Sequence, residues 1–404
     1  MKPRLVILVS HPIQYYAPLY RELALRGDID VHVVYLSDAG ANAYHDVGFG
    51  RMVSWDIPLL EGYPYTVLEP DLDLATRRFW SLHSFRLKET LDWLDPDAIL
   101  LYGYASRLNW SALDWARRRR RKVLYISDSN ANTPRSRWKS WLKKVVVGNF
   151  FSKVDAFLCT SESNSRYLSQ YGAGVQRICR LPFAIDVSRF SNGAKPPGQR
   201  RSFDFVWAGK LIPRKRPRDF IDALQIFADI SGLEVSARVI GDGPLLEELA
   251  VMARTLHPRV TLQFDGFANQ SAMPALLQES AVFVFTSEAE PYGLVATEAA
   301  AAGLALIVAE GIGCIGDTVL ARPGVNAIIY PLGDVMALAK AMLRLRVESD
   351  LLLEMQQASS RIASDHDIPV AADVIDRVVR ELGVTGKIAQ PSGAARPGDG
   401  GRGR

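Results

Sequence analysis

The sequence has 404 residues, of which 48% are apolar and 23% are charged, so the chain is long enough for two or three domains with buried cores. This mixture excludes a miniprotein and a largely disordered chain. The 48 Lys and Arg residues exceed the 44 Asp and Glu residues by a formal net charge of only +4. Such a balance gives no reason to expect nucleic acid as a partner.

Two further features bear on the cellular compartment. The cysteines Cys159, Cys179 and Cys314 lack CxxC spacing and are not grouped with histidines as zinc ligands would be. The apolar run Leu5–Val9 is too short for a signal peptide, and the longest uncharged apolar stretch, Ala299–Ala309, is about half of the ~20 residues that a spanning helix needs. We therefore expect a cytoplasmic protein without a structural metal, at most peripheral on the inner face of the cell membrane.

Short β-branched runs alternate with helical segments in both halves of the chain, which is typical of parallel sheets flanked by helices. In the first half we expect strands at Leu5–Val9, Val31–Leu36, Ala98–Tyr102, Val123–Ser127 and Ala156–Thr160. In the second half we expect strands at Phe203–Ala208, Val235–Ile240, Val260–Phe264, Val282–Thr286, Ala305–Ala309 and Ala327–Tyr330. The pattern predicts an α/β fold with two Rossmann-like domains, whose sheets place their carboxyl ends at a shared crevice.

Composition divides the chain into segments. The stretch Ser188–Arg201 is rich in Gly, Pro and charge and is not expected to build a strand or a helix, so it marks a linker. After about Leu382 the chain turns to Gly, Pro, Ser and Arg and is expected to stay unfolded. The predicted segments are an N-terminal domain (1–186), the linker (187–202), a C-terminal domain (203–365), a helix that packs back toward the N-terminal domain (366–384) and a disordered tail (385–404).

The segment Phe285–Gly303 carries the strongest chemical signal. A buried strand is expected to end at Thr286, and Gly293 allows close backbone approach where the next helix begins, so the amides of that helix can hold a phosphate. If Glu290 precedes the helix, Glu290 and Glu298 can address one elongated ligand. The structural alternative is that Glu290 caps the helix and Glu298 is a solvated side chain.

Three turns in the same half point to similar chemistry. Lys210 and Lys215 lie in a loop after the strand Phe203–Ala208, where their charges can neutralise a diphosphate, although basic loops are usually only solvated. The turn Gly241–Pro244 follows the next strand, and Gly311–Asp317 follows a later one. Both turns suit backbone approach to a nucleotide, and neither is specific by itself.

In this order the elements resemble the C-terminal domain of GT-B glycosyltransferases, in particular the large retaining family 4. The resemblance covers about residues 203–345, and the ordered series makes it specific. The matching residues are Gly209-Lys210 to Lys215, Gly241-Asp242-Gly243-Pro244, Gly266-Phe267, Glu290 to Glu298, Ala302-Gly303 and Arg322-Pro323-Gly324-Val325-Asn326. Two positions depart from the pattern, because Lys210 stands where Arg is usual and Arg216 where Gly is common.

The resemblance implies a GT-B fold and an activity. The implied activity is retaining transfer of a sugar from a nucleotide-sugar donor to a hydroxyl of a glycan, lipid-linked or small-molecule acceptor, in bacterial polysaccharide or glycoconjugate synthesis. Because the Asp-x-Asp strings of the chain lack a nucleotide-binding context, we expect a metal-independent enzyme. No cofactor is implied beyond the nucleotide sugar as co-substrate.

The resemblance also implies roles for particular residues. Lys210 and Lys215 would hold the nucleotide diphosphate. Glu290 would contact the donor sugar, and Glu298 would bind the ribose. The other donor-binding positions would be Gly209, Gly241, Gly243, Phe267, Ser287, Tyr292, Gly293 and Leu294.

The first half matches the family less closely, as expected of a domain that binds the acceptor. Where the family often has a Gly-rich turn, this chain has Ser10-His11-Pro12, and Pro12 suits the first position of a helix with His11 at its N-cap. Asp128 follows the strand Val123–Ser127, where it can orient or deprotonate an acceptor hydroxyl. A structural cap is the alternative for both residues. The candidate catalytic residues are Lys210, Lys215, Glu290, His11 and Asp128.

The segment Arg135–Val145 is basic and amphipathic. Trp138, Trp141, Leu142 and Val145 recur at helical spacing, with the basic residues mostly elsewhere around the axis. Such a stripe usually packs on its own domain. A Trp-bearing basic helix can also lie on an anionic bilayer, where each basic residue adds ~1 kcal/mol near the surface. Both alternatives stay open.

Two other functions stay open as well. A GT-B phosphorylase would use inorganic phosphate on the same architecture. A catalytically silent nucleotide-sugar-binding or scaffold protein of a polysaccharide-assembly complex would keep the cleft without turnover, which the unusual His11 loop and Lys210 favour and the intact Glu290, Glu298 and Lys215 oppose. The Asp-x-Asp strings at 71–73 and 95–97 have no nucleotide-binding context, so no metal is expected.

Overall fold

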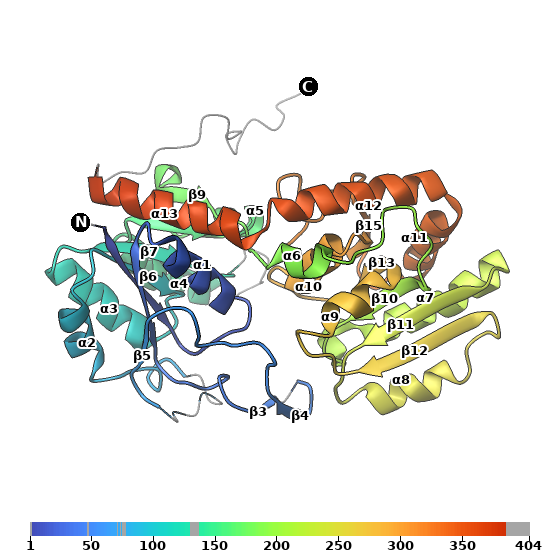
Figure 1. Cartoon of the computed structure of the whole chain (residues 1–404), viewed down its shortest axis with the longest axis horizontal. Helices are drawn as coiled ribbons and strands as arrows, with labels where there is room; N and C mark the ends of the chain where they lie inside the picture. Colours follow the sequence, from blue (N-terminus) through green and yellow to red (C-terminus); the bar gives the residue numbers. More distant parts are fainter. Residues whose placement is uncertain are drawn as a thin grey trace, which may run out of the picture.

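The computed structural model describes residues 2–46, 48–70, 72, 74, 78–129 and 137–384. Two α/β domains lie side by side, and the C-terminal helix returns to the first of them (Figure 1). The two parallel sheets confirm the predicted fold class. The predicted tail at 385–404 lies outside the described residues.

The sheet of the N-terminal domain has, within the described residues, seven parallel strands in the order β5-β2-β1-β6-β7-β8-β9. Its strands are β1 (Arg4–Val9), β2 (Asp30–Tyr35), β5 (Tyr65–Val67), β6 (Ala98–Tyr102), β7 (Lys122–Ile126), β8 (Ala156–Cys159) and β9 (Ile178–Arg180). Its helices are α1 (Ala17–Arg26), α2 (Leu87–Leu94), α3 (Arg107–Arg118), α4 (Arg137–Phe151) and α5 (Glu162–Gln170), with a 3-10 turn at Val175–Arg177.

Both faces of this sheet are covered, which explains why its strands are nearly continuous apolar runs. Ile7 belongs to the core under α1 and the C-terminal helix α13 (Ile368–Val384). Leu8 points the other way, into the core under α2 to α5. Arg26 of α1 fastens α13 by an ion pair with Asp373. Figure 1 shows α13 lying alongside α1.

The sheet of the C-terminal domain has six described parallel strands in the order β12-β11-β10-β13-β14-β15. These are β10 (Phe203–Ala208), β11 (Val235–Ile240), β12 (Val260–Gly266), β13 (Ser280–Phe285), β14 (Ala305–Ala309) and β15 (Ala327–Tyr330). The helices are α7 (Pro217–Ser231), α8 (Leu246–Ala253), α9 (Met273–Gln278), α10 (Leu294–Ala301), α11 (Val335–Val347) and α12 (Ser349–Ser364), with a 3-10 turn at Pro213–Lys215.

All predicted strands are present, with ends shifted by no more than two residues. The sequence patterns missed β5 and β9, the two edge strands of the first sheet, because three-residue strands show no clear periodicity. They also missed the antiparallel pair β3 (Tyr44–Asp46) and β4 (Arg51–Val53), which forms a small separate sheet.

The linker is more ordered than predicted. It begins with a short helix, α6 (Val187–Ser191), whose N-cap Asp186 accepts a hydrogen bond from the Arg189 amide at 3.2 Å. Phe190 in this helix is fully buried. The expectation of no helix in this stretch is therefore wrong, because one cap and one buried aromatic side chain suffice to fix a single turn despite the surrounding Gly and Pro.

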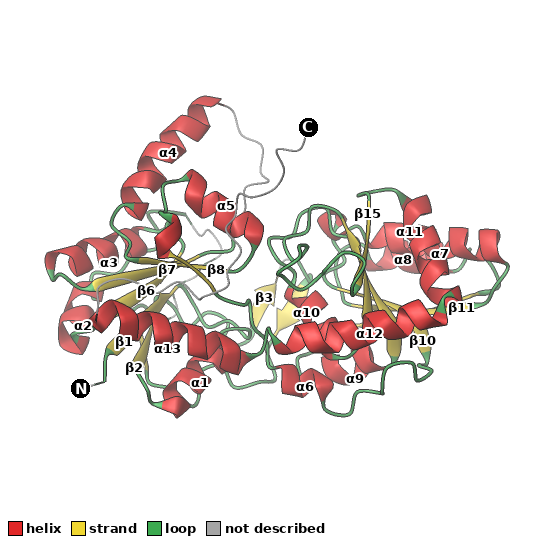
Figure 2. Ribbon diagram, turned by 90° about the horizontal axis from the view of Figure 1, so that it is seen from above, coloured by secondary structure: helices red, strands yellow, loops and turns green. Residues whose placement is uncertain are grey.

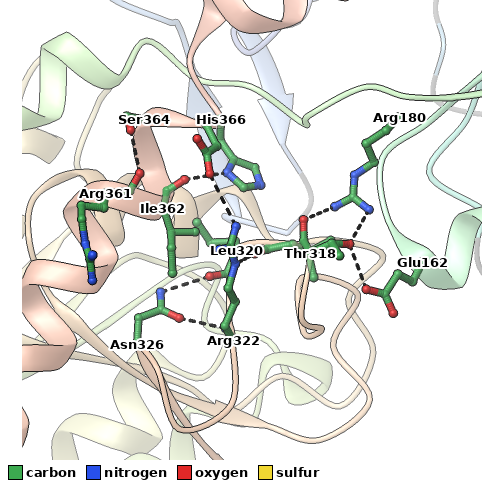
Figure 3. A network of polar contacts seen from close by, with 12 residues as sticks. Glu162, Arg180, Thr318, Leu320, Arg322, Asn326, Arg361, Ile362, Ser364 and His366 are labelled. Atoms are coloured by element: carbon green, nitrogen blue, oxygen red, sulfur yellow. Dashed lines mark hydrogen bonds and ion pairs between the residues drawn. The ribbon is translucent and has the colours of Figure 1, made fainter. Parts of the chain in front are cut away.

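Polar contacts join the two domains near the linker. Arg180 of β9 donates to the Thr318 carbonyl at 2.7 Å and to its hydroxyl at 3.0 Å. The same hydroxyl donates to Glu162 of α5 at 2.9 Å. Figure 3 shows Arg180 and Glu162 meeting Thr318 from one side. These contacts fix the loop 311–326 of the C-terminal domain against the N-terminal domain.

Candidate functional site

Two cavities lie where the carboxyl ends of the two sheets face each other. The larger cavity has a volume of about 740 Å³ and is lined by Asp128 and Lys143 of one domain and by Arg214 and Glu290 of the other. The smaller cavity has a volume of about 110 Å³, and its lining includes Gly209, Gly241, Phe267 and Glu298. The predicted donor residues are thus divided between two neighbouring spaces.

The loop after β10 brings Lys215 to Glu290. The Lys215 carbonyl accepts a hydrogen bond from the Thr286 hydroxyl at 2.8 Å, which holds the loop against the end of β13. The Lys215 ammonium forms an ion pair with the Glu290 carboxylate, and each side chain is only 16% exposed. Two residues that are 75 positions apart therefore form an ion pair, and the Glu290 member of the pair lines the larger cavity.

Arg216, which stands where the family often has Gly, adopts a left-handed backbone with φ of 48°. This conformation is uncommon for residues with a side chain. Asp219 compensates by accepting hydrogen bonds from the Arg216 guanidinium at 2.7 and 3.1 Å. This bidentate contact stabilises at Arg216 a backbone conformation that Gly would adopt without strain.

Gly293 separates the two carboxylates. Its φ is 93°, and a Cβ atom at this position would lie 2.3 Å from Cε1 of Phe285, so only glycine fits. Helix α10 begins at the next residue with Gly293 as its N-cap and no side-chain cap. Glu290 therefore precedes the helix and does not cap it, and the structural alternative for Glu290 is wrong.

Glu298 is buried rather than solvated, with an exposed fraction of 2%. Its Oε1 atom has no hydrogen-bond partner among the described residues. Burial raises the pKa of this carboxyl to about 7, and the nearby Arg189 opposes the rise. A buried acceptor without a partner is costly unless something satisfies it, and Glu298 lines a cavity in which a ligand hydroxyl can do so.

Tyr15 also lines the smaller cavity, and no sequence motif pointed to it. Burial raises its pKa well above the ordinary value, and the charges of Glu298 and Glu290 add to this effect. The negative charges of both carboxylates therefore disfavour ionisation of the Tyr15 hydroxyl. Tyr15 follows the Ser10-His11-Pro12 turn, so this loop contributes to the site through a residue that the motifs did not single out.

His11 differs from the prediction. Helix α1 begins at Ala17 rather than at Pro12, and its N-cap is Tyr16. Amides of Tyr16 and Ala17 instead bond to the Ile13 carbonyl, which forms a separate turn before the helix. His11 Nδ1 lies 2.8 Å from the Ser10 hydroxyl, and the ring lines neither cavity. The predicted N-cap is wrong because Pro18, not Pro12, occupies the first turn of the helix.

Lys143 has a position that the amphipathic pattern did not reveal. It lines the larger cavity, with its ammonium 4.7 Å from the ring centroid of Tyr167 and 4.9 Å from that of Tyr171. This residue thus faces the cleft, while Val145 is 52% exposed. The segment is helical from Arg137, but the side chains of Trp138, Trp141 and Leu142 lie outside the described part.

Lys210 lies beside the cavities rather than in their walls. Its ammonium contacts both carboxylate oxygens of Asp46 at 2.7 Å. Of the other predicted donor residues, Ser287, Tyr292 and Leu294 are buried, and neither they nor Gly243 line the two cavities.

Among the described residues, no group of three His, Cys, Asp or Glu side chains is arranged to hold a metal ion. No helix in the same part of the chain has the length and apolar character to span a bilayer.

Two Rossmann-like domains that face each other across a cleft define the GT-B fold. The solved structure of Anabaena Alr3699/HepE in complex with UDP is similar, with a TM-score of 0.67 at 19% identity over 95% of this chain and 100% of that chain. Residues 194–361 match the model for glycosyl transferases group 1, and residues 12–184 match the glycosyl transferase 4-like domain. The chain therefore belongs to the group 1 glycosyltransferase family.

The curated relatives match a smaller part of the chain. A glycogen synthase of Mycobacterium tuberculosis is 27% identical over 222 residues, which cover 54% of this chain and 52% of the relative. The UDP-Gal:alpha-D-GlcNAc-diphosphoundecaprenol alpha-1,3-galactosyltransferase of Escherichia coli is 25% identical over 209 residues, which cover 49% of this chain and 53% of the relative. The chain thus spans about half the length of the curated relatives it matches.

The buried Glu298 predicts a pH-dependent stability. Its folded pKa of about 7 exceeds the ordinary value of 4.5, so the folded chain binds the proton more tightly than the unfolded chain. The free energy of unfolding should therefore fall by roughly 3 kcal/mol as the pH rises from about 4.5 to 7. Glu298→Gln should match the wild type near the acidic end of this range and be more stable above its neutral end.

Urea unfolding midpoints measured across this pH range test the expectation. The control is Glu354→Gln on α12, an exposed carboxylate for which no such divergence is expected. A difference between Glu298→Gln and the wild type that is the same at acidic and neutral pH would contradict the buried, proton-binding state of Glu298.

Proposed function

We propose that the chain is a retaining glycosyltransferase that moves a sugar from a nucleotide-diphosphate sugar to an acceptor hydroxyl without a metal ion. One observation carries the proposal: Glu290, paired with Lys215, and Asp128 line the same cavity from opposite domains. A donor held by one domain and an acceptor held by the other would meet in this cavity. The family and its ordered motifs support this assignment.

The donor would extend from the larger to the smaller cavity. Glu298, with its unpartnered oxygen, suits a ribose hydroxyl, and Phe267 offers an aromatic face to a base. Gly209 and Gly241 leave room for the nucleotide because they have no side chains. UDP-sugars are the first choice of donor, because the names of the Anabaena structure and of the Escherichia coli relative contain UDP or UDP-Gal.

The reaction would proceed by front-face substitution. The acceptor oxygen bonds to the anomeric carbon as the bond from that carbon to the diphosphate oxygen breaks on the same face. The acceptor proton passes to the departing phosphate oxygen, and Asp128 orients the hydroxyl. Negative charge grows on the diphosphate, so Lys210, Lys215 and the amides at the start of α10 stabilise mainly the transition state.

The acceptor would be a glycan, a lipid-linked glycan or a small molecule, in bacterial polysaccharide or glycoconjugate synthesis. A lipid-linked acceptor is favoured by the diphosphoundecaprenol in the name of the Escherichia coli relative. Such an acceptor would bring a cytoplasmic enzyme to the inner face of the membrane, where the basic segment Arg135–Val145 can contact anionic lipid.

A panel of UDP-, GDP- and ADP-sugars in a thermal-shift assay tests the donor site. A ligand that binds only the folded chain at about 100 times its Kd stabilises it by about 2.7 kcal/mol, so one base should raise the Tm clearly. A flat response to the whole panel contradicts the proposal. Binding without hydrolysis or transfer across an acceptor panel would instead favour the silent scaffold protein.

Lys215→Ala should lower turnover by roughly 10²–10³-fold, because it removes a charge that acts on the leaving diphosphate. Lys340→Ala on α11 is the matched control, since this exposed lysine belongs to the same domain and lies in neither cavity. Initial rates and far-UV circular dichroism of both variants separate catalysis from folding. Turnover of Lys215→Ala at the wild-type rate would mean that the diphosphate is held elsewhere.

Membrane contact predicts binding to vesicles that contain phosphatidylglycerol. Trp138→Ala with Trp141→Ala should move much of the protein from the pellet to the supernatant after sedimentation, because the aromatic anchors are lost. Trp93→Ala on α2 removes an indole from a residue that is 72% exposed and lies outside the basic segment, and should have no effect. Equal pelleting of all three proteins would exclude the segment as the contact.

A further inference from the structure

A segment of the N-terminal domain lies directly on the donor-binding loops of the C-terminal domain. It consists of β3, β4 and the residues that follow to Asp56, and we call it the hairpin, meaning its described residues only. Figure 1 shows β3 and β4 reaching from their own domain toward the other one, and Figure 2 shows β3 between the two domains. The family motifs did not involve this segment.

Asp46 at the end of β3 is held in a fixed position. The amides of Gly48 and Phe49 donate hydrogen bonds to its Oδ1 atom at 2.9 and 3.1 Å. Its two oxygens contact the Lys210 ammonium, which also lies 4.7 Å from the ring centroid of Phe49. The Asp46 side chain is 13% exposed and the Lys210 side chain is 35% exposed, so solvent screens this ion pair only in part.

The hairpin also forms a wall of the smaller cavity. Phe49 and Trp55 line this cavity, and their rings lie 5.0 and 6.3 Å from the ring of Phe267. Arg51 lies over the same ring and pairs with Asp242 at 3.4 Å. The volume of this cavity, about 110 Å³, is well below the roughly 300–1,000 Å³ that is typical of small-molecule and cofactor pockets.

The backbone of the hairpin approaches the glycine loops closely. A Cβ atom at Gly48 would lie 2.6 Å from Cδ of Lys210, and one at Gly243 would lie 3.0 Å from the carbonyl oxygen of Gly48. The hairpin therefore fills the space beside Lys210 and Gly243. A diphosphate cannot approach both groups while the hairpin stays in this position.

We propose that Asp46 is an internal counter-ion that holds Lys210 in place of the donor's diphosphate, and that the hairpin is a lid that the donor must displace. This inference rests on the proposed donor site. Asp46 and the diphosphate are both anions that need the same ammonium, and they repel each other at this distance. Each donor that binds must first break the Asp46–Lys210 pair, so the apparent affinity is lower than the intrinsic affinity of the open site.

The experiment is isothermal titration with the nucleoside diphosphate whose sugar responds in the thermal-shift panel. Asp46→Asn keeps an oxygen for the amides of Gly48 and Phe49 but removes the charge, so it should bind the diphosphate roughly tenfold more tightly than the wild type. The matching nucleoside, which has no phosphate, should bind both proteins equally. Asp46→Glu, which keeps the charge, should restore the weaker diphosphate binding.

The matched control is Asp56→Asn at the other end of the hairpin. Asp56 accepts hydrogen bonds from the Ser271 amide at 3.2 Å, so this variant removes one carboxylate charge and weakens one interdomain contact without touching Lys210. Its affinity for the diphosphate should stay within about twofold of the wild type. A gain equal to that of Asp46→Asn would overturn the counter-ion role, because loss of docking alone would then explain the effect.

Two further outcomes separate this inference from the donor site itself. If the wild type binds the diphosphate, Glu298→Gln weakens that binding and Asp46→Asn does not tighten it, the donor site stands and the counter-ion is wrong. If neither the wild type nor Asp46→Asn binds any nucleoside diphosphate, both proposals fall. Equal tightening of diphosphate and nucleoside in Asp46→Asn also overturns the inference.

Discussion

All strands of a parallel sheet end at the same edge, and in this chain two such edges face each other. The residues that follow β10, β11 and β13 in one domain and β7 in the other therefore meet, although the chain separates them widely. The contacts of Arg180 and Glu162 with Thr318, together with α13 on α1, hold the two edges in this orientation. The cavities exist because of this arrangement. The ion pairs between the domains, Asp46 with Lys210 and Arg51 with Asp242, depend on it as well.

Three of the cations in the cleft are paired with carboxylates of the same chain. Lys215 holds Glu290, Lys210 holds Asp46, and Arg51 holds Asp242. A diphosphate ligand that binds these cations must therefore replace a carboxylate of the chain as their partner, because the cations are already paired. Its net affinity reflects the difference between the two sets of contacts, which is much smaller than either set alone.

The sequence predicted the strands and the motif loops because both depend on local patterns. Apolar runs of five or six residues identify buried strands, and a glycine after a strand marks a backbone approach. The Asp46–Lys210 contact has no such signal, since 164 residues separate the partners and β3 has only three residues. The predicted start of α1 is wrong because two prolines, at 12 and 18, both suit the first turn of a helix, and the helix begins beside the second of them.

The separate positions of Glu290 and Glu298 follow from the collision that a side chain at 293 would have with Phe285. In one uninterrupted helix, residues eight positions apart lie about 80° from each other around the axis, and both carboxylates would address neighbouring space. The left-handed backbone of Gly293 prevents a single helix through both residues, so α10 begins after Glu290. Glu290 then joins Lys215 at the larger cavity, while Glu298 enters the smaller one, where it forms no ion pair with a described residue and the charge of Arg189 only partly opposes the effect of burial. Of the two carboxylates, Glu290 lies beside a lysine and Glu298 does not. An elongated ligand with an anionic centre and hydroxyl groups at one end therefore matches the two positions better than a compact ligand does.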